Sequence, residues 1–219
     1  MDQPEIKLWQ GEIAARETDY PQYWRILDSI EQQYANTINN VQRHRRYVEI
    51  HARLRILLGD AVKAAPEQLL IHKAEYGKPY LADYPELAFN LSHTGNQMVL
   101  AMANNCYLGV DIEQCKPRKN LTALVDKCFA EEEKNYWQKL LEAQQIRAFY
   151  QLWVRKEAFV KATGRGIALG LNNCVVNPES QNELLRIPEN YGLASEWLVQ
   201  AIDLGEPVCG AVVAKNKAV

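Results

Sequence analysis

Two acidic residues stand two positions apart in the apolar stretch "YLGVDIEQ", and they raise the first chemical question. If this stretch is a β-strand, Asp111 and Glu113 point to one face and the apolar residues around them point to the other, because side chains alternate along a strand. Two carboxylates on one face repel each other unless a positive charge lies beside them. The pattern therefore predicts a bound cation or a basic side chain next to Asp111 and Glu113.

A third acidic residue, Glu157, falls within an apolar helical stripe in "QIRAFYQLWVRKEAFVKATGRG". The stripe consists of Ile146, Phe149, Tyr150, Trp153 and Val160, and Lys161 stands at its edge. The opposite, solvent-facing side is expected to carry Arg147, Gln151 and Arg155. Burying an unpaired carboxylate is costly, so Glu157 should either meet a partner or not be ionised at all.

Two partners for Glu157 remain open from the residues alone. An ion pair with Lys161, four residues later, would contribute only about 0.3–0.5 kcal/mol if exposed. A divalent cation shared by Asp111, Glu113 and Glu157 would satisfy all three acids. Three oxygen ligands with open positions suit Mg²⁺ bound together with a phosphate.

Basic and hydroxyl side chains elsewhere could bind an anion. The stretch "RHRRYVEIHARLR" predicts a helix whose arginines form either a solvated face or part of an anion site. These arginines are Arg43, Arg45, Arg46, Arg53 and Arg55. "YGKPY" predicts a turn that presents Lys78, because Gly and Pro flank the lysine. Ser92 and His93 end a predicted strand, where a histidine is either structural or part of a displayed site.

The elements that would position these residues are both helical and extended. Residues 21–63 have helical periodicity, and residues 121–145 look helical before the Glu157 helix. "LAFNLSH" and "MVLAMA" around "TGNQ" predict a β-hairpin, and "YLGVDIE" predicts a further strand. Residues 196–215 repeat the strand–turn–strand pattern.

Composition limits the class of protein. The chain has 219 residues, of which 47% are hydrophobic, and a formal net charge of −2. We therefore expect a protein that folds alone, with no bias toward nucleic acid or membranes. The N-terminus lacks a signal-peptide pattern and no long apolar run is present, which predicts a cytoplasmic protein. The five cysteines form no C-x-x-C pair, so neither a disulfide framework nor a thiolate zinc site is expected.

Four motifs, "YGKPY", "FNLSHTG", "GVDIE" and "FYQLWVRKEAFVKATGRGI", resemble in this order those of the 4′-phosphopantetheinyl transferases, in their larger, pseudodimeric, surfactin-synthetase-activating class. The resemblance spans residues 43–171. It implies an enzyme that transfers the 4′-phosphopantetheine group of coenzyme A to a serine of apo acyl, peptidyl or polyketide carrier domains. The reaction would require Mg²⁺ and release adenosine 3′,5′-bisphosphate, and it would serve fatty-acid, polyketide or nonribosomal-peptide synthesis.

The resemblance also implies roles for individual residues. The ligands of Mg²⁺, or of Mn²⁺, would be Asp111, Glu113 and Glu157. Glu157 is the candidate base for the serine proton, and Lys161 would neutralise the transferring phosphate. The residues that would contact coenzyme A are Arg46, Arg55, Lys78, Pro79, Ser92, His93, Asp111 and Lys161. Glu133 of "CFAEEE" resembles an acidic position that contributes to the site in some members, although its flanking residues depart from their aromatic-rich pattern.

The fold implied by the resemblance is α+β, with two similar halves related by pseudo-two-fold symmetry and a cofactor cleft between them. Residues 1–106 would supply contacts to the coenzyme A phosphates, and residues 107–219 would supply the metal ligands and catalytic residues. A monomer is expected, because the two halves would provide internally what a smaller relative obtains by oligomerising.

Two other functions compete with this one. A non-catalytic module that binds coenzyme A or a carrier domain would not need three acids and Lys161. A different Mg²⁺-dependent phosphotransferase could use a nucleotide, but the sequence contains no G-x-x-x-x-G-K-[ST] loop. Neither the carrier nor the pathway is indicated by any motif.

Overall fold

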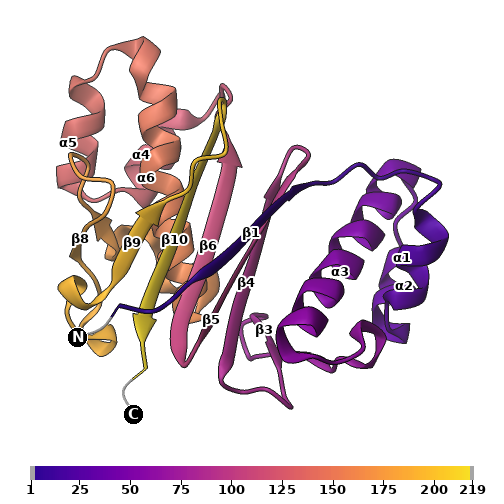
Figure 1. The fold of residues 1–219 in the computed structure, drawn as a ribbon. Coiled ribbons are helices and arrows are strands. Elements are labelled where there is room, and N and C mark those ends of the chain that lie inside the picture. The colour runs from indigo at the N-terminus through magenta and orange to yellow at the C-terminus, as the bar shows by residue number, and fades with distance from the viewer. Residues whose placement is uncertain (1–2, 218–219) are drawn as a thin grey trace.

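The computed structural model describes residues 3–217, which form two antiparallel three-stranded sheets between two groups of helices (Figure 1). The strand orders are β1-β5-β4 and β6-β10-β9. The strands are β1 (Lys7–Glu12), β4 (Leu87–Thr94), β5 (Gln97–Asn104), β6 (Cys106–Gln114), β9 (Leu198–Ala201) and β10 (Val208–Asn216). Two short ribbons pair β2 (Ile71–Lys73) with β3 (Pro79–Leu81) and β7 (Val175–Val176) with β8 (Leu184–Arg186).

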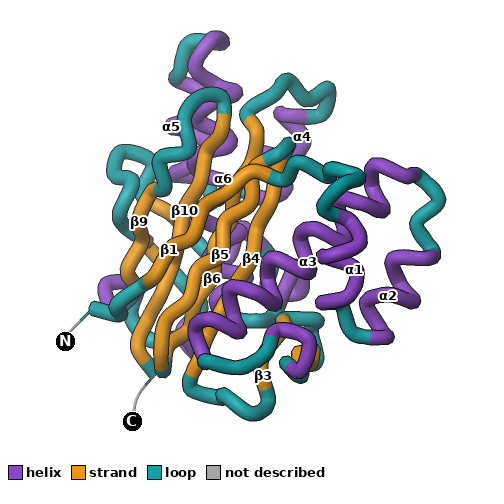
Figure 2. The backbone as a smooth tube through the Cα atoms, turned by 45° about the vertical axis from the view of Figure 1, so that its right-hand side comes forward, coloured by secondary structure: helices purple, strands orange, loops and turns teal. Residues whose placement is uncertain are grey.

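The helices lie on the two outer sides of the strands, as the purple tubes in Figure 2 also show. They are α1 (Tyr20–Ile26), α2 (Ser29–Asn36), α3 (Val41–Val62), α4 (Leu121–Cys128), α5 (Glu131–Lys139) and α6 (Glu142–Thr163). The longest two, α3 and α6, have 22 residues each. The sequence-based prediction of a mixed α+β fold is therefore confirmed.

Helix α3 packs through the apolar face that its periodicity predicts. Ile50, Leu54 and Leu58 are each at most 4% exposed. Leu54 and Leu58 share an apolar cluster with Phe89 of β4 and Leu100 of β5. Burial of such side chains contributes about 1.5–3 kcal/mol each, so this contact fixes α3 on the first sheet.

The predicted hairpin and the predicted acidic strand are both confirmed. β4 and β5 pair from Leu87 with Asn104 to Thr94 with Gln97, and the turn contains Gly95 at a φ of 52°, a left-handed conformation that suits glycine. β6 contains "GVDIE", and its apolar side chains Leu108, Val110 and Ile112 belong to one buried cluster. The alternation that places Asp111 and Glu113 on the other face is therefore present.

Both parts of the chain show one order of elements. A strand comes first (β1 or β6), followed by three helices of which the last has 22 residues, then a two-stranded ribbon, then two strands. In each sheet the first strand pairs with the last, and the last pairs with the one before it. The second sheet includes the predicted 196–215 unit, with residues 202–207 connecting β9 to β10.

Several features differ from the sequence-based expectations. Strand β1 and the two ribbons were not predicted, and the helical region 21–63 contains three separate helices. The expectation that Arg155 faces solvent is wrong, because the residue is 4% exposed and donates to the carbonyl oxygens of Gln151, Asn177 and Ser180. None of the helices in the described part of the chain has the length and apolarity needed to span a membrane.

Candidate active site

Asp111, Lys161 and Ser92 meet where β4, β6 and α6 approach one another. The Nζ atom of Lys161 lies 2.7 Å from Oδ1 of Asp111 and 3.2 Å from Oγ of Ser92. The Ser92 hydroxyl donates to the same Asp111 oxygen over 3.0 Å. Three elements, β4, β6 and α6, therefore converge on one carboxylate, which is 6% exposed.

A close approach of α6 to β6 brings Lys161 to Asp111. Gly109 faces the helix so closely that a Cβ at this position would lie 2.0 Å from the carbonyl oxygen of Ala158 and 2.4 Å from the amide nitrogen of Ala162. Any larger side chain would push the helix away from the strand. Glycine at residue 109 is therefore a condition for the contact between Lys161 and Asp111.

Glu113 and Glu157 complete a cluster of three carboxylates. Burial raises the pKa of Glu157, and the charges of Asp111 and Glu113 raise it further. Burial and the Asp111 charge raise the pKa of Glu113 in the same way, partly opposed by Arg118, whose Nη2 lies 4.0 Å from Oε1 of Glu113. Within residues 3–217, the side chain of Glu157 makes neither a hydrogen bond nor an ion pair. Lys161 thus pairs with Asp111 rather than with Glu157.

The donor chemistry of this cluster fits a hard divalent cation. Oδ2 of Asp111 is buried and has no hydrogen-bond partner among the described residues. Carboxylate oxygens are the ligands that Mg²⁺ prefers. In the part of the chain that the structure describes, however, no three His, Cys, Asp or Glu side chains are arranged to hold a metal ion. Lys161 supplies the neutralising charge instead, and the predicted ligand set of Asp111, Glu113 and Glu157 remains a prediction.

Lys78 connects the first part of the chain to the acidic strand. Its Nζ donates to the carbonyl oxygens of Leu108 in β6 and Ala162 in α6, both at 2.9 Å. Burial lowers the pKa of Lys78 to about 8. The turn that presents it has Gly77 at a φ of 83°, as "YGKPY" predicts. Pro79 begins β3, where it pairs with Lys73.

Arg46 and His93 are two basic residues beside the cluster. Arg46 donates to Oδ1 of Asn96, in the turn that follows His93, over 3.3 Å. Partial desolvation lowers the pKa of His93, and the charges of Arg46, Lys161 and His51 lower it further. These interactions place Arg46, His93 and Lys161 within electrostatic reach of one another. An anion bound among them would relieve this repulsion.

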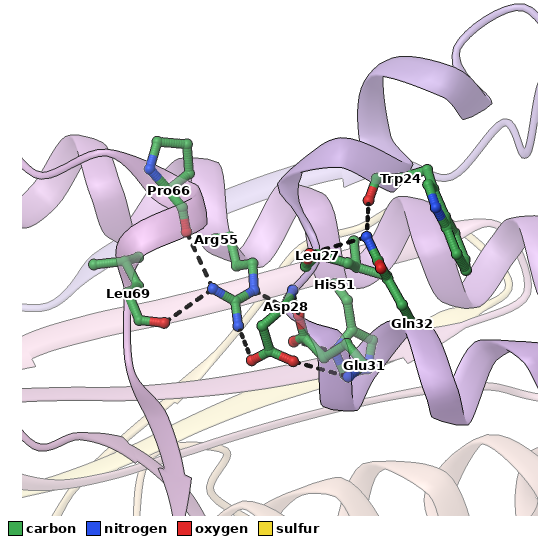
Figure 3. A network of polar contacts seen from close by, with 9 residues as sticks. All are labelled: Trp24, Leu27, Asp28, Glu31, Gln32, His51, Arg55, Pro66 and Leu69. Atoms are coloured by element: carbon green, nitrogen blue, oxygen red, sulfur yellow. Dashed lines mark hydrogen bonds and ion pairs between the residues drawn. The ribbon is translucent and has the colours of Figure 1, made fainter.

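Arg55 does not belong to this group. It is fully buried in a network with Asp28 and Glu31 of the α2 region, and its Nη1 donates to the carbonyl oxygens of Pro66 and Leu69 over 3.1 and 3.0 Å (Figure 3). Every donor nitrogen of the guanidinium therefore has a protein acceptor. These contacts give the predicted coenzyme A contact of Arg55 no support and indicate a structural residue.

Comparison with known proteins decides the family. The sequence profile of the 4′-phosphopantetheinyl transferase superfamily matches residues 107–213. A protein of Synechocystis sp. that is named as a candidate 4′-phosphopantetheinyl transferase is 32% identical to this chain over 179 residues. The match covers 81% of this chain and 72% of that protein. The 4′-phosphopantetheinyl transferase HetI of Nostoc sp. is 32% identical over 75% of this chain and 70% of its own length. A 4′-phosphopantetheinyl transferase of Bacillus subtilis is 31% identical over 67% of this chain and 69% of its own length.

The chain belongs to the 4′-phosphopantetheinyl transferase superfamily. The resemblance seen in the four motifs is therefore confirmed. The matched region of this transferase contains Asp111, Glu113, Glu157 and Lys161, whereas Lys78, Ser92 and His93 lie before it. The structure brings Ser92 and His93 of the earlier region beside Asp111 and Lys161, whereas Lys78 donates to the backbone of β6 and α6.

Glu133 of this transferase has a structural environment. Both Glu133 and Lys156 are completely buried, and their charged atoms lie 2.7 Å apart. Glu133 also accepts from the backbone N–H groups of Ala130 and Val176, and Lys156 donates to the carbonyl oxygen of Leu171. The pair joins α5, α6 and β7. Lys156 directly precedes Glu157 in the sequence. Periodicity did not identify it, because each partner resembles a solvent-facing charge.

Two further residues near the site were also missed. Asn90 and Thr94 lie on either side of Ser92 in β4 and accept hydrogen bonds from the backbone of β6. The signal was present in the sequence, since the polar residues of "FNLSHT" recur with the period of a strand.

Proposed function

We propose that this chain transfers the 4′-phosphopantetheine group of coenzyme A to a serine of an apo acyl, peptidyl or polyketide carrier domain and releases adenosine 3′,5′-bisphosphate. The observation that carries the proposal is the buried Asp111, which has one oxygen on Lys161 and the other without a partner among the described residues, in a member of this family. A carboxylate in that state is suited to a cation that arrives with a phosphate substrate.

Asp111, Glu113 and Glu157 would hold Mg²⁺, or Mn²⁺ in its place. When bound, the cation would neutralise the pyrophosphate oxygens of coenzyme A. Lys161 would contact the same phosphate, because its ammonium group is held by Asp111 and Ser92 and its side chain is 29% exposed. Phosphoryl transfer depends mainly on in-line placement and charge neutralisation, which these side chains can provide.

In the reaction, the serine oxygen of the carrier forms a bond to the phosphorus atom that bears the pantetheine arm. The bond from this phosphorus to the bridging oxygen breaks, and the bridging oxygen leaves with adenosine 3′,5′-bisphosphate. Glu157 would accept the serine proton, since its side chain makes no hydrogen bond or ion pair within residues 3–217 and burial raises its pKa toward that of a useful base.

The anionic end of coenzyme A would lie against Arg46, Lys78, Ser92 and His93. Arg46 and His93 suit the 3′-phosphate, because two negative charges would offset the charges of Arg46 and Lys161 that lower the pKa of His93. Arg55 is left out of this pocket, since its donors are used within the fold. Pro79 would act by fixing the turn of Lys78.

We further propose two similar halves, residues 1–106 and 107–219, related by pseudo-two-fold symmetry with the cofactor cleft between them. The shared order of elements and the shared strand order of the two sheets support this division. Because each half supplies part of the site, the enzyme would act as a cytoplasmic monomer, without nucleic acid or membrane partners.

One experiment tests the function directly. The protein is incubated with coenzyme A, MgCl₂ and several apo carrier domains, and each carrier is weighed by mass spectrometry. We expect one carrier to gain a phosphopantetheine group, and no gain with EDTA or with the Asp111→Asn variant. Binding of coenzyme A or of a carrier without any mass gain would indicate a non-catalytic module, and modification by a nucleotide instead of coenzyme A would indicate a different phosphotransferase.

A further inference from the structure

Strands β4 and β6 lie side by side, yet they belong to different sheets. β4 is the last strand in the order β1-β5-β4, and β6 is the first in β6-β10-β9. One edge of β6 is paired with β10, where Asp111 stands opposite Ala211 and Glu113 opposite Cys209. The other edge faces β4 without a backbone ladder, so its amide groups need acceptors of another kind.

Side chains of β4 provide those acceptors. Oδ1 of Asn90 accepts from the N–H of Val110 over 2.8 Å, and Oγ1 of Thr94 accepts from the N–H of Gln114 over 3.1 Å. Between them, Oγ of Ser92 accepts from the N–H of Ile112 over 3.2 Å. Residue numbers rise together on both strands, so the strands run parallel, with a side-chain oxygen where a neighbouring strand would offer a carbonyl.

The bonded residues of β6 alternate with the two acidic ones. Asp111 lies between Val110 and Ile112, and Glu113 lies between Ile112 and Gln114. The three bonds therefore fix the height and rotation of the strand segment that carries both carboxylates. A shift of one residue along β6 would turn these carboxylates to the opposite face.

We propose, on the basis of the function proposed above, that Asn90 and Thr94 are positioning residues that hold the carboxylates of Asp111 and Glu113 in register with Glu157 and Lys161 on α6. Within residues 3–217, neither side chain forms a hydrogen bond to these carboxylates, so each acts through the backbone of β6. Ser92 differs, because its hydroxyl also donates to Asp111. Partners that orient metal ligands typically change metal affinity by 10–100-fold when removed.

Thr94 offers a matched test. Thr94→Val keeps the shape of the side chain and removes the acceptor, whereas Thr94→Ser keeps the acceptor. Thr37→Val serves as a control, because the Thr37 hydroxyl also makes a single bond to the backbone, to the carbonyl oxygen of Tyr34 at 2.7 Å, at the end of α2. Asn90→Ala repeats the test at the other end of the three-bond row.

Mn²⁺ binding to the protein without carrier is measured by the electron paramagnetic resonance signal of the free ion, and the Mg²⁺ concentration that half-saturates transfer is measured separately. We expect Thr94→Val and Asn90→Ala to weaken Mn²⁺ binding by roughly 10-fold. Thr94→Ser should retain wild-type binding, and Thr37→Val should change only the melting temperature. A shift in the half-saturating Mg²⁺ concentration should accompany the loss of Mn²⁺ binding.

The inference fails if Thr94→Val and Thr94→Ser bind Mn²⁺ equally, or if Thr94→Val loses turnover by the same factor at every metal concentration. It also fails if Thr37→Val weakens Mn²⁺ binding as much as Thr94→Val, because loss of stability would then explain the effect. Failure of the proposed function would give a different result, since wild-type protein would then bind Mn²⁺ without modifying any carrier.

Discussion

Lys161 donates to Oδ1 of Asp111 over 2.7 Å, while Oδ2 of the same carboxylate is buried without a hydrogen-bond partner in the described residues. One oxygen is therefore neutralised by the protein and the other is not. Glu113 and Glu157 lie near enough to Asp111 that its charge raises the pKa of both. The site thus has an excess of negative charge that a cation–phosphate substrate could balance.

Glu157→Gln should separate catalysis from stability. The change removes a carboxylate whose charged form is disfavoured by burial and by two neighbouring acids, so the melting temperature in EDTA should rise. Transfer to the carrier should fall by about 100-fold or more, the effect expected when a charged group of the transition state is lost. A differential scanning calorimetry trace and a carrier mass assay on the same sample check both. Near wild-type turnover at saturating Mg²⁺ would remove Glu157 from the mechanism.

The lowered pKa of Lys78 predicts that coenzyme A binding depends on pH. Its pKa falls from 10.5 to about 8 in the fold because of burial, and a bound phosphate would favour the charged form. Above pH 8, coenzyme A binding should therefore take up a proton, and its affinity should fall as the pH rises toward 10. Calorimetry at pH 9 in buffers of different protonation enthalpy measures this uptake. Lys78→Met should abolish it.

The same shift predicts a change in stability. Between pH 8 and 10.5 the unfolded state holds the Lys78 proton more tightly than the folded state, so this lysine should make the fold more stable as the pH rises through that window. Urea unfolding of wild type and of Lys78→Met at several pH values checks the sign. An opposite slope would show that the lysine is stabilised in its charged form.

The sequence predicted more of the acidic strand than of its surroundings. Alternation alone placed Asp111 and Glu113 on one face, and helical spacing placed Glu157 on the apolar face of its helix. The structure shows that this face brings Glu157 near the two other acids. The partner of Asp111 could not be read from spacing, because Lys161 lies 50 positions away in sequence and reaches it only where Gly109 admits the helix. Short-range patterns determine faces, whereas contacts between elements depend on tertiary packing.

The roles of the individual arginines in α3 could not be told apart from the sequence for the same reason. Arg46 and Arg55 have similar sequence surroundings, yet Arg46 contacts the turn after His93 and Arg55 is buried with Asp28 and Glu31. Their positions on α3 differ by nine residues, which places them on opposite faces of the helix, and the packing of α2 and of residues 66–69 buries the face of Arg55. Burial also explains why Arg155 was wrongly expected in solvent.

Arg55→Leu should therefore reduce stability and leave cofactor recognition intact. Removing one partner of a buried ion pair typically costs about 3–5 kcal/mol, because the remaining carboxylates are left unpaired. Urea unfolding measures the loss, and the ratio of kcat/KM for coenzyme A and dephospho-coenzyme A measures recognition at a temperature where the variant is folded. Arg43→Ala, at an exposed position of α3, is the control for both. A lower ratio in Arg55→Leu would return Arg55 to the pocket.

His93→Ala tests the assignment of the 3′-phosphate. Dephospho-coenzyme A lacks this group, so it cannot use a contact with His93 or Arg46. A charge-assisted hydrogen bond contributes roughly 1.5–3 kcal/mol, which corresponds to a preference for coenzyme A of about 10-fold or more. His93→Ala should lower kcat/KM for coenzyme A and leave that for dephospho-coenzyme A nearly unchanged. Equal losses with both would mean that His93 shapes the site or joins the chemistry.

The carrier domain should dock beside the loop that follows the acidic strand. This loop, residues 115–120, contains Lys116 and Lys119, which are exposed, and Arg118, which is not free to move because its Nε donates to the Tyr150 hydroxyl over 2.9 Å. Carrier domains are generally acidic around their serine, so the two lysines offer complementary charge next to Glu113. Arg118 would instead hold the loop in place.

Reversing both charges, in Lys116→Glu with Lys119→Glu, should raise the KM for the carrier several-fold and leave the KM for coenzyme A unchanged. The wild-type KM for the carrier should rise with salt, because exposed charges are screened within about 10 Å at 0.1 M ionic strength, and the salt dependence should be weaker in the variant. Lys73→Glu with Lys139→Glu, two exposed lysines outside this loop, controls for net charge. If the control raises the carrier KM as much as the loop variant does, net charge rather than this surface governs docking. If neither variant changes it, the loop does not receive the carrier.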